Sequence, residues 1–195
     1  MCRTRRGALA ALAVLLAGCA QLPGFGNPAE GVLKLSPAPR SFHLEGRVSV
    51  KAGEESFSGG LAWRRAPGNE ELLLSTPLGQ GVAELRGDGE SVTLTDAKGK
   101  VFRAPDADAL VRQALGLELP LRGLAWWVVG HPRPDAPFHA EPDAAGHLAK
   151  LEQDAWRIDF SRYEARGKAV LPGKLVARRG EDLEVRLVVD RWELP

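Results

Sequence analysis

Cys19 is the strongest candidate for covalent modification, because it directly follows Leu16-Ala17-Gly18, a segment that ends in two small residues. Three arginines among residues 1–6 precede an apolar run over residues 8–17. A basic start, a short apolar stretch and small residues before a cleavage point are typical of a secretory signal. The run of about ten apolar residues is too short for a permanent transmembrane helix, which needs roughly 20. The sequence therefore predicts a secretory signal that ends beside Cys19.

The same segment resembles the lipobox of bacterial lipoproteins. In those proteins the cysteine thiol is diacylglycerylated, the signal is cut before it, and the new amine is acylated. The resemblance implies a signal peptide over residues 1–18 and a lipid anchor on Cys19. The next residues are Ala20 and Gln21, so the aspartate that usually retains such proteins in the inner membrane is absent. We therefore expect an anchor in the outer membrane, on its periplasmic face; an ordinary signal with a coincidental cysteine is the alternative.

Catalytic and metal-binding signatures are absent from the sequence. The histidines His43, His131, His139 and His147 are scattered, without the H-x-x-H or H-E-x-x-H spacing of zinc sites. There is no G-x-S-x-G elbow, and acidic pairs such as Glu54-Glu55 lie where we expect solvated loops. We expect no enzyme activity, no metal and no cofactor. A secreted hydrolase would require a cluster of histidine with serine or carboxylate.

Charge and cysteine content argue against a nucleic-acid-binding protein and against a domain stabilised by disulfides. Removal of residues 1–18 would leave 177 residues (195 less 18), enough for one domain with a sizeable core. It would leave 23 basic side chains (26 less 3) against 25 acidic ones, a net charge of −2. Nucleic-acid binding needs a clustered basic surplus, so we expect no nucleic-acid partner. Cys2 would leave and Cys19 would carry lipid, so we expect no disulfide, and a monomer that depends on its apolar core.

Period-two alternation predicts a mainly β domain over residues 41–195, with a tether ahead of it. Residues 19–40 hold four prolines and little periodicity, which is typical of a tether between lipid and domain. Turn residues then recur at spacings of roughly ten residues, which indicates an antiparallel meander of about ten or eleven strands. The expected strands lie at 42–51, 57–63, 71–75, 82–86, 92–94, 101–103, 147–151, 155–160, 174–177 and 183–192, with a polar loop over 64–70.

Two helices are expected in the middle of the chain. Over residues 107–115 the apolar positions follow the i, i+3, i+4, i+7 spacing of one helix face. A second helix is expected over Leu121–Val129, and Trp126 and Trp127 leave it almost no polar side. Such a helix must be covered on most sides. It is either a core helix packed on a filled sheet or part of the wall of an apolar cleft. The spacing of its apolar residues is the same in both cases, so both interpretations stay open.

Leu78 is a hydrophobic residue within a turn. Pro77 precedes it and Gly79 follows it, and this turn chemistry pushes the leucine outward. Single exposed leucines are common on protein surfaces and need no function. On a membrane-tethered domain, however, the same side chain can dip into lipid, where its burial contributes roughly 1.5–3 kcal/mol. That is enough for a reversible contact with a membrane.

Short motifs lie in a characteristic order along the chain. They are Phe42-His43-Leu44-Glu45-Gly46-Arg47-Val48, Leu61-Ala62-Trp63, Leu73-Leu74 with Pro77-Leu78-Gly79, Leu119-Pro120-Leu121 with Leu124, Trp127, Val129-Gly130 and Pro132, Trp156-Arg157-Ile158 with Tyr163 and Pro172, and Val188 to Leu194 with Trp192. In this order the chain resembles the family of the outer-membrane lipoprotein receptor LolB, across nearly the whole mature length. It departs at Asp154-Ala155, where the family often has a glycine, and at the extra tryptophan of Ala125-Trp126.

The resemblance implies both a fold and an activity. The fold is mainly β (α+β), an open, strongly curved antiparallel half-barrel with helices packed in its concave side. The activity is to accept lipoproteins from the soluble periplasmic carrier LolA and to insert them into the outer membrane. The family's protruding loop carries a leucine needed for insertion, which the match assigns to Pro77, Leu78 and Gly79. The expected partners are therefore LolA, the acyl chains of lipoproteins and outer-membrane lipid.

We expect acyl chains to occupy an apolar cavity on the concave side, which would contribute about 0.8 kcal/mol per buried CH₂. A one-residue slip in strand register would invert the face that each wall residue occupies. The expected wall residues are Leu44, Val48, Val50, Leu61, Trp63, Leu72, Leu74, Leu124, Trp127, Ile158, Val185 and Leu187. The alternative is a structural or assembly lipoprotein that binds a protein partner through a sheet edge or apolar patch. A filled concave face would favour that alternative, and an open hollow of several hundred Å³ would favour lipid transfer.

Overall fold

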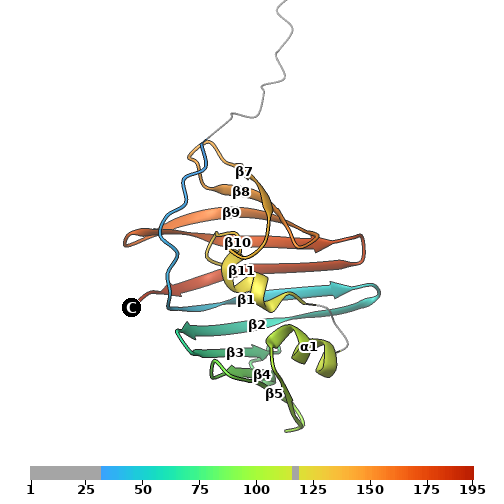
Figure 1. The fold of residues 1–195 in the computed structure, drawn as a ribbon. Helices are drawn as coiled ribbons and strands as arrows, with labels where there is room; N and C mark the ends of the chain where they lie inside the picture. Colours follow the sequence, from blue (N-terminus) through green and yellow to red (C-terminus); the bar gives the residue numbers. More distant parts are fainter. Residues whose placement is uncertain (1–31, 116–118) are drawn as a thin grey trace, which may run out of the picture.

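One antiparallel sheet of eleven strands forms most of the domain in the computed structural model, which describes residues 32–115 and 119–195 (Figure 1). The expected signal peptide, Cys19 and residues 20–31 lie outside the described residues. The strands are β1 (Phe42–Ala52), β2 (Glu55–Ala66), β3 (Asn69–Ser75), β4 (Gly81–Gly87), β5 (Val92–Asp96), β6 (Val101–Ala104), β7 (Phe138–Pro142), β8 (Leu148–Gln153), β9 (Trp156–Arg166), β10 (Ala169–Arg179) and β11 (Leu183–Glu193). The helices are α1 (Ala107–Leu115) and α2 (Leu121–Trp127).

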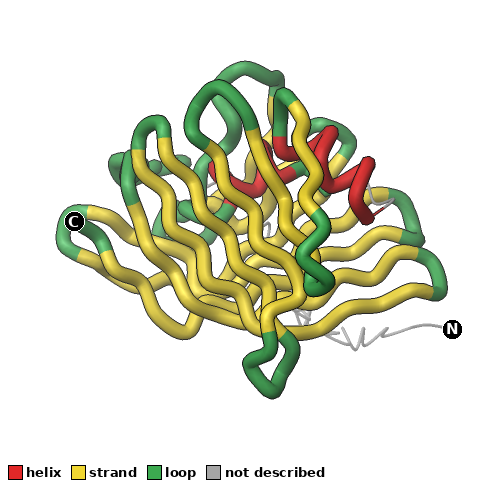
Figure 2. Tube along the Cα trace, turned by 90° about the horizontal axis from the view of Figure 1, so that it is seen from below, coloured by secondary structure: helices red, strands yellow, loops and turns green. Residues whose placement is uncertain are grey.

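The first strand lies in the middle of the sheet and pairs with both β2 and β11. From β1 the chain runs outward to β6 at one edge, crosses one face of the sheet through α1 and α2, and returns inward from β7 to β11. Figure 2 shows the sheet strongly curved, with the helices on its inner side. The edge strands β6 and β7 do not pair with each other, so the half-barrel is open. The expected fold class is confirmed.

Glycines allow very close approaches between neighbouring strands. A Cβ on Gly59 would lie 2.0 Å from the carbonyl oxygen of Ser75, next to a register shift in β3. A Cβ on Gly46 would lie 2.2 Å from the carbonyl oxygen of Val188, next to the register shift between β1 and β11. Register shifts and glycines are common means of bending a sheet. Any larger side chain at these two positions would push the strands apart.

The apolar helix α2 is covered on most sides, as its sequence requires. Gly123 lies inside it, although glycine disfavours a helix by about 1 kcal/mol relative to alanine. A Cβ there would lie 2.8 Å from the Trp127 ring, so the glycine makes room for the indole. Trp127 is fully buried and contacts Trp156, with ring centroids 6.1 Å apart. No helix of the described residues is long and apolar enough to cross a membrane.

The turns between strands lie at two opposite ends of the half-barrel. The β1–β2, β3–β4, β8–β9 and β10–β11 connections lie at one end, which we call the Leu78 end. The β2–β3, β4–β5, β7–β8 and β9–β10 connections lie at the other, which we call the Gly68 end.

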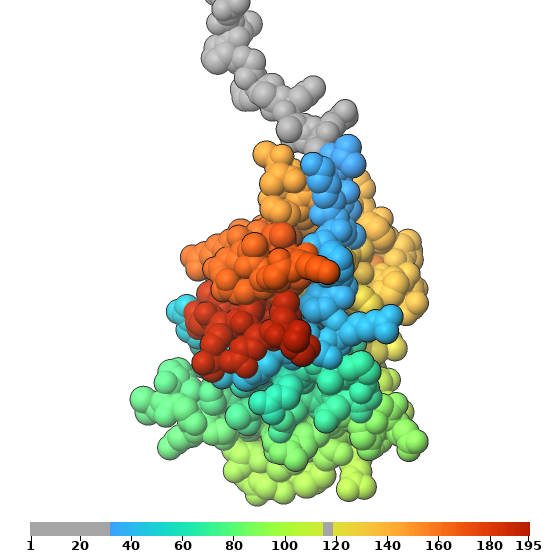
Figure 3. All heavy atoms as spheres, turned by 90° about the vertical axis from the view of Figure 1, so that its left-hand side faces the viewer, coloured from blue at the N-terminus to red at the C-terminus, as the bar shows by residue number. Residues whose placement is uncertain are grey.

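Residues 32–41, which we call the strap, lie against the Gly68 end. The Lys34 amide donates a 2.7 Å hydrogen bond to the Gly146 carbonyl in the β7–β8 turn. The Ser36 hydroxyl accepts from the Val170 amide at 3.1 Å and donates to the Val170 carbonyl at 3.3 Å. Figure 3 looks onto this end and shows the strap, in blue, beside the red and orange C-terminal strands. Residues 32–40 of the expected tether therefore lie against the domain.

The prediction of a polar loop over residues 64–70 is wrong. Strand β2 continues to Ala66 and β3 begins at Asn69, which leaves Pro67-Gly68 as a tight turn. Arg64 pairs with Glu71 and Arg65 with Glu70, so opposite charges across the ladder extend both strands.

Three further boundaries differ from the expectation. Strand β7 was not predicted, because Pro137 and Pro142 enclose a short segment without clear alternation. Strands β9 and β10 meet at a tight turn around Gly167, so both are longer than expected. Helix α2 ends at Trp127 and is followed by a turn over residues 128–130, two residues earlier than predicted.

Candidate functional site

The ten expected wall residues of the sheet share one face. Leu44 lies opposite Trp63, which lies opposite Leu72 of β3. The other rows are Leu61 with Leu74, Val48 with Leu187, Val50 with Val185, and Ala177 with both Val185 and Ile158. Residues directly opposite each other on neighbouring strands point to the same face. That face packs with Leu124 and Trp127 of α2 in one apolar cluster, so it is the concave face.

Most of these side chains are packed against one another. Nine of the twelve are buried: Leu44, Leu61, Trp63, Leu72, Leu124, Trp127, Ile158, Val185 and Leu187. Val48, Val50 and Leu74 are only partly buried, and all three belong to the halves of β1 and β3 nearer the Leu78 end. Phe57, opposite Val50, is also partly buried. The apolar face is therefore filled around α2, and three of its wall residues nearer the Leu78 end are incompletely covered.

Sequence reasoning missed an aromatic cluster on the same face. Phe42 contacts Trp63 and Trp192 edge to face, each with ring centroids 5.7 Å apart. The Trp63 Nε1 donates a 2.9 Å hydrogen bond to Glu70 Oε1. The signal was present, because Phe42 precedes Leu44 by two residues in the same alternation. The cluster belongs to the part of the concave face nearer the Gly68 end.

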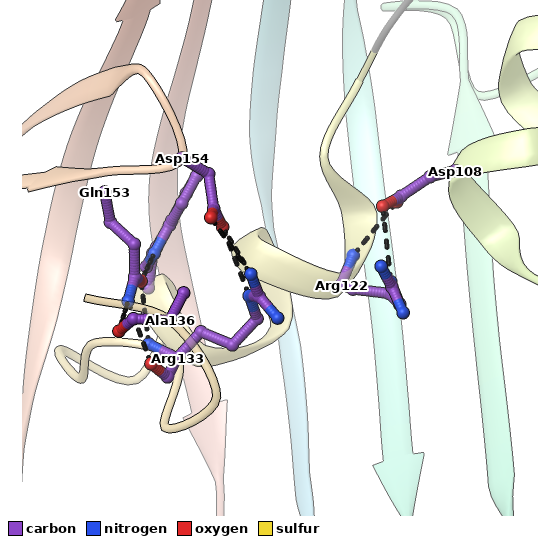
Figure 4. Close-up of polar contacts among 7 residues, drawn as sticks. Asp108, Arg122, Arg133, Ala136, Gln153 and Asp154 are labelled. Carbon is purple, nitrogen blue, oxygen red and sulfur yellow. Dashed lines mark hydrogen bonds and ion pairs between the residues drawn. The ribbon is translucent and has the colours of Figure 1, made fainter. Parts of the chain in front are cut away.

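Two polar side chains attach α2 to the sheet. Gln153 Oε1 accepts hydrogen bonds from Trp127 Nε1 at 3.0 Å and from the Arg133 amide at 2.8 Å. Gln153 Nε2 donates to the carbonyls of Arg133 and Ala136, as Figure 4 shows. On the opposite side, Arg65 Nη1 of β2 donates at 3.2 Å to the Ala125 carbonyl. The helix is thus held from both halves of the sheet.

Ion pairs surround the beginning of α2 and the loop after it. Arg133 forms a forked pair with Asp154, with Nε to Oδ2 at 3.1 Å and Nη2 to Oδ1 at 3.0 Å. The backbone amide of Arg122 donates to Asp108 Oδ1 of α1 at 3.1 Å, and the side-chain Nε of Arg122 lies 3.5 Å from Asp108 Oδ2. Figure 4 shows both pairs on either side of α2. They connect the two helices and the β8–β9 turn at the Leu78 end.

The loop between β3 and β4 presents Leu78 to solvent. The Gly79 amide donates to the Thr76 carbonyl at 2.9 Å, and the Thr76 amide donates to the Gln80 carbonyl at 2.8 Å. Gly79 has a φ of +83°, which glycine adopts without strain. Leu78 is 90 % exposed, more than any other large hydrophobic side chain of the described residues. A closed turn therefore holds an apolar side chain outside the domain.

Hollows open at both ends of the concave face. At the Gly68 end, one of about 680 Å³ lies between α2, the start of α1 and the β2–β3 and β4–β5 turns, with Trp126 and Arg65 in its wall. At the Leu78 end, one of about 340 Å³ lies between the two helices and the β8–β9 and β10–β11 turns. Neither is lined by any of the twelve expected wall residues. The nine buried wall residues form the packed interior between the two hollows.

The histidines lie apart from one another. His147 Nδ1 lies 3.2 Å from Asp143 Oδ2, and its ring stacks on Tyr163, whose hydroxyl donates to the Leu148 carbonyl at 2.7 Å. Burial raises the pKa of Tyr163. Burial lowers the pKa of His131, which lies against Ser36 of the strap. Within residues 32–115 and 119–195, no three His, Cys, Asp or Glu side chains are grouped so as to hold a metal ion.

A family model described as outer membrane lipoprotein LolB matches residues 40–192, from the end of the strap to β11. The chain belongs to the LolB family. A relative from Thiobacillus denitrificans, named outer-membrane lipoprotein LolB, is 39% identical over 189 residues, which cover 97% of each chain. Another of that name, from Ectopseudomonas mendocina, is 36% identical over 190 residues, which cover 93% of each chain. The resemblance stated from the motifs is confirmed.

Solved structures with little sequence identity share the fold of this LolB-family chain. A LolA-superfamily protein from Nitrosomonas europaea superposes with a TM-score of 0.55 at 9% identity, over 83% of this chain and 88% of that one. A DUF1329-family protein from Desulfovibrio piger gives a TM-score of 0.54 at 8% identity, over 80% and 86%. Family membership makes the chain an outer-membrane lipoprotein and confirms the expected location.

Proposed function

We propose that this chain accepts lipoproteins from the periplasmic carrier LolA, shelters their acyl chains on its concave apolar face, and inserts them into the outer membrane. Residues 1–18 are then the cleaved signal, Cys19 carries the chain's own lipid anchor, and residues 19–40 are the tether between that lipid and the domain. No nucleotide takes part, because the transfer depends on a difference in apolar contact alone.

One observation carries this proposal: Leu78 is 90 % exposed at the same end of the half-barrel as the partly buried wall residues Val48, Val50 and Leu74. Leu74 points into the concave face and Leu78 follows it on the loop of the same strand. A side chain of this size contributes roughly 1.5–3 kcal/mol when it enters lipid. The loop therefore supplies a reversible membrane contact beside the apolar face.

Acyl chains need more room than the packed interior has. Trp127 is fully buried between α2 and the sheet, and Gln153 and Arg65 hold the helix in place. Binding of an acyl chain therefore requires α2 to shift away from the sheet. The partly buried residues Val48, Val50 and Leu74 mark where the chain enters.

The packed interior also favours a second candidate function, an assembly lipoprotein that binds a protein partner. In that case the concave face is a permanent core, and recognition uses an apolar patch or one of the edge strands β6 and β7. The two functions differ in whether the cargo must carry acyl chains.

The test presents LolA loaded with a labelled lipoprotein to vesicles that contain the full chain. We expect the acylated lipoprotein to move into the vesicles without nucleotide, and the same protein without its acyl chains to stay in solution. Equal capture of both forms would support the protein-binding alternative, and retention of all cargo on LolA would contradict the proposal.

A further inference from the structure

The strap joins the domain at the end of the half-barrel opposite to Leu78. Its first residue, Val32, lies against the β7–β8 turn, where a Cβ on Gly146 would lie 2.8 Å from the Val32 carbonyl oxygen. From there the strap, in blue in Figures 1 and 3, runs across the Gly68 end to the start of β1. The Leu78 loop lies at the other end of the same sheet. The chain toward Cys19 therefore continues from the Gly68 end.

The number of residues between Cys19 and the strap limits how far the Leu78 loop reaches toward a membrane that holds Cys19. Strand β1 has eleven residues, so the two ends of the half-barrel are about 36 Å apart. Thirteen peptide units separate Cys19 from Val32, and they span at most about 45 Å. While the strap is docked, the loop reaches that membrane only if about four-fifths of this maximum is used. So extended a chain keeps few conformations, which is unfavourable.

Release of the strap changes this limit. Strand β1 begins at Phe42, also at the Gly68 end, so a released strap adds ten peptide units between Cys19 and the sheet. The resulting 23 units span up to about 80 Å, more than twice the separation of the two ends. The Leu78 loop then reaches the membrane without a taut connection.

The strap is held by side-chain and single backbone contacts rather than by a strand ladder. Lys34 and Ser36 form hydrogen bonds with the β7–β8 turn and with the start of β10. Leu33 packs against the core and is partly buried, whereas Val32 is 76 % exposed and Leu35 is 41 % exposed. By contrast, β1 pairs with strands on both sides. Segments with few buried contacts open while the rest of a domain stays folded.

We propose that the strap is a releasable spacer that controls the membrane contact of Leu78. While the strap is docked, it keeps the Leu78 loop away from the membrane that carries the chain's own lipid, and its release from the Gly68 end lets the loop reach that membrane. This inference rests on the proposed function, since it assumes that Cys19 is anchored and that Leu78 enters the same membrane.

The test follows the Leu78 loop with an environment-sensitive dye on Gln80→Cys, an exposed position of that loop. The lipid-anchored chain is placed in vesicles of phosphatidylethanolamine and phosphatidylglycerol. Cleavage removes Cys2 and acylation occupies Cys19, so the dye attaches at position 80. The vesicles are diluted until the dye signal per chain no longer depends on their concentration, so each loop reports contact with its own membrane.

Three changes separate reach from other effects. Leu33→Ser loosens the strap, and Leu35→Ser makes the same exchange at an exposed position of the strap. Insertion of ten glycine and serine residues after Gln21 lengthens the tether by as much as strap release does. We expect Leu33→Ser and the insertion each to raise membrane contact about threefold, as for generic linkers of these lengths, and Leu35→Ser to leave it unchanged.

The two effective changes should not add. In the lengthened chain Leu33→Ser should raise contact by less than about 1.5-fold, because the loop already reaches the membrane. Ser36→Ala loosens the strap without touching the core, and it should raise contact in the native-length chain as Leu33→Ser does. No gain from either strap variant, or an equal gain at both tether lengths, would overturn the spacer.

Leu78→Glu distinguishes a failure of the spacer from a failure of the proposed function. It should abolish the membrane signal of the dye at both tether lengths. Loss of the signal in Leu78→Glu together with no response to tether length or strap variants would overturn the spacer and leave the membrane contact standing. A signal that Leu78→Glu does not change, or no signal in any chain, would contradict the membrane contact itself and the spacer with it.

Discussion

Trp127 Nε1 donates a 3.0 Å hydrogen bond to Oε1 of Gln153, which is the buried polar side chain of the described core. The bond joins an almost wholly apolar helix to the end of β8, 26 residues further along the chain. The same amide group also binds the backbone of the loop that follows α2. One glutamine thus fixes both the helix and the loop over the concave face.

Replacing Gln153 with alanine should therefore destabilise the fold strongly. It would leave the Trp127 indole N–H and the Arg133 amide without acceptors, and each orphaned buried group costs about 1–3 kcal/mol. We expect the free energy of unfolding in urea to fall by about 3–5 kcal/mol for Gln153→Ala. The matched control is Gln113→Ala on the exposed face of α1, which should change it by less than about 0.5 kcal/mol. Similar values for both variants would contradict the role given to Gln153.

Arg65 should act as a weaker restraint on the other side of α2. Arg65→Ala removes one hydrogen bond to the Ala125 carbonyl, so we expect about 1 kcal/mol lower stability and faster hydrogen exchange of the α2 amides. Its neighbour Arg64 points to the opposite face and pairs with Glu71 at 3.5 Å, which makes Arg64→Ala the matched control. Unchanged exchange in Arg65→Ala would show that this bond does not restrain the helix.

His131 should make the packing of the strap sensitive to pH. Burial lowers its pKa below the ordinary 6.5, although a hydrogen bond with the Ser36 backbone opposes the shift. The unfolded chain therefore binds a proton first, and stability is lost as pH falls through 6.5 toward the lower folded pKa. We expect His131→Gln to lose less free energy of unfolding than the original chain between neutral pH and about pH 5. Equal losses in urea titrations at the two pH values would contradict this.

Local patterns predicted most elements of the fold. The alternation from Phe42 onward predicted the strand and which of its side chains share a face, and the wall residues of β1, β2 and β3 do align in register. The two helices were found because period-two alternation gives way to the spacing of Leu110, Val111 and Ala114. These strands and helices depend on residues that are close together in the sequence, so the spacing of apolar residues predicts them directly.

Long-range contacts were not predictable in the same way. Charged residues such as Arg64 and Arg65 indicated a loop, because their partners across the ladder are visible only once the strands pair. Strand β7 is stabilised by β8 and has little pattern of its own between two prolines. The hollow of about 340 Å³ at the Leu78 end is lined by residues 112, 122, 133 and 179 among others, and no sequence spacing reveals that these residues lie close together.

Leu78 should matter for insertion and not for folding. Leu78 is 90 % exposed, so Leu78→Glu should change the free energy of unfolding by less than about 0.5 kcal/mol, while it places a charge at the proposed lipid contact. Incorporation of labelled lipoprotein into vesicles should fall about tenfold or more, as the lost burial predicts. Gln80→Glu adds the same charge to the same exposed loop and serves as the control. Full incorporation by Leu78→Glu would refute the insertion role.

The position of the bound acyl chain tests the proposed transfer most directly. A photo-crosslinking residue at Val50 faces the concave side, and one at the adjacent Lys51 faces the convex side, because side chains alternate along β1. With a lipoprotein labelled in its acyl chains and delivered by LolA, we expect crosslinks from position 50 and none from position 51. Crosslinks from neither position, or equal crosslinks from both, would contradict acyl-chain binding on the concave face.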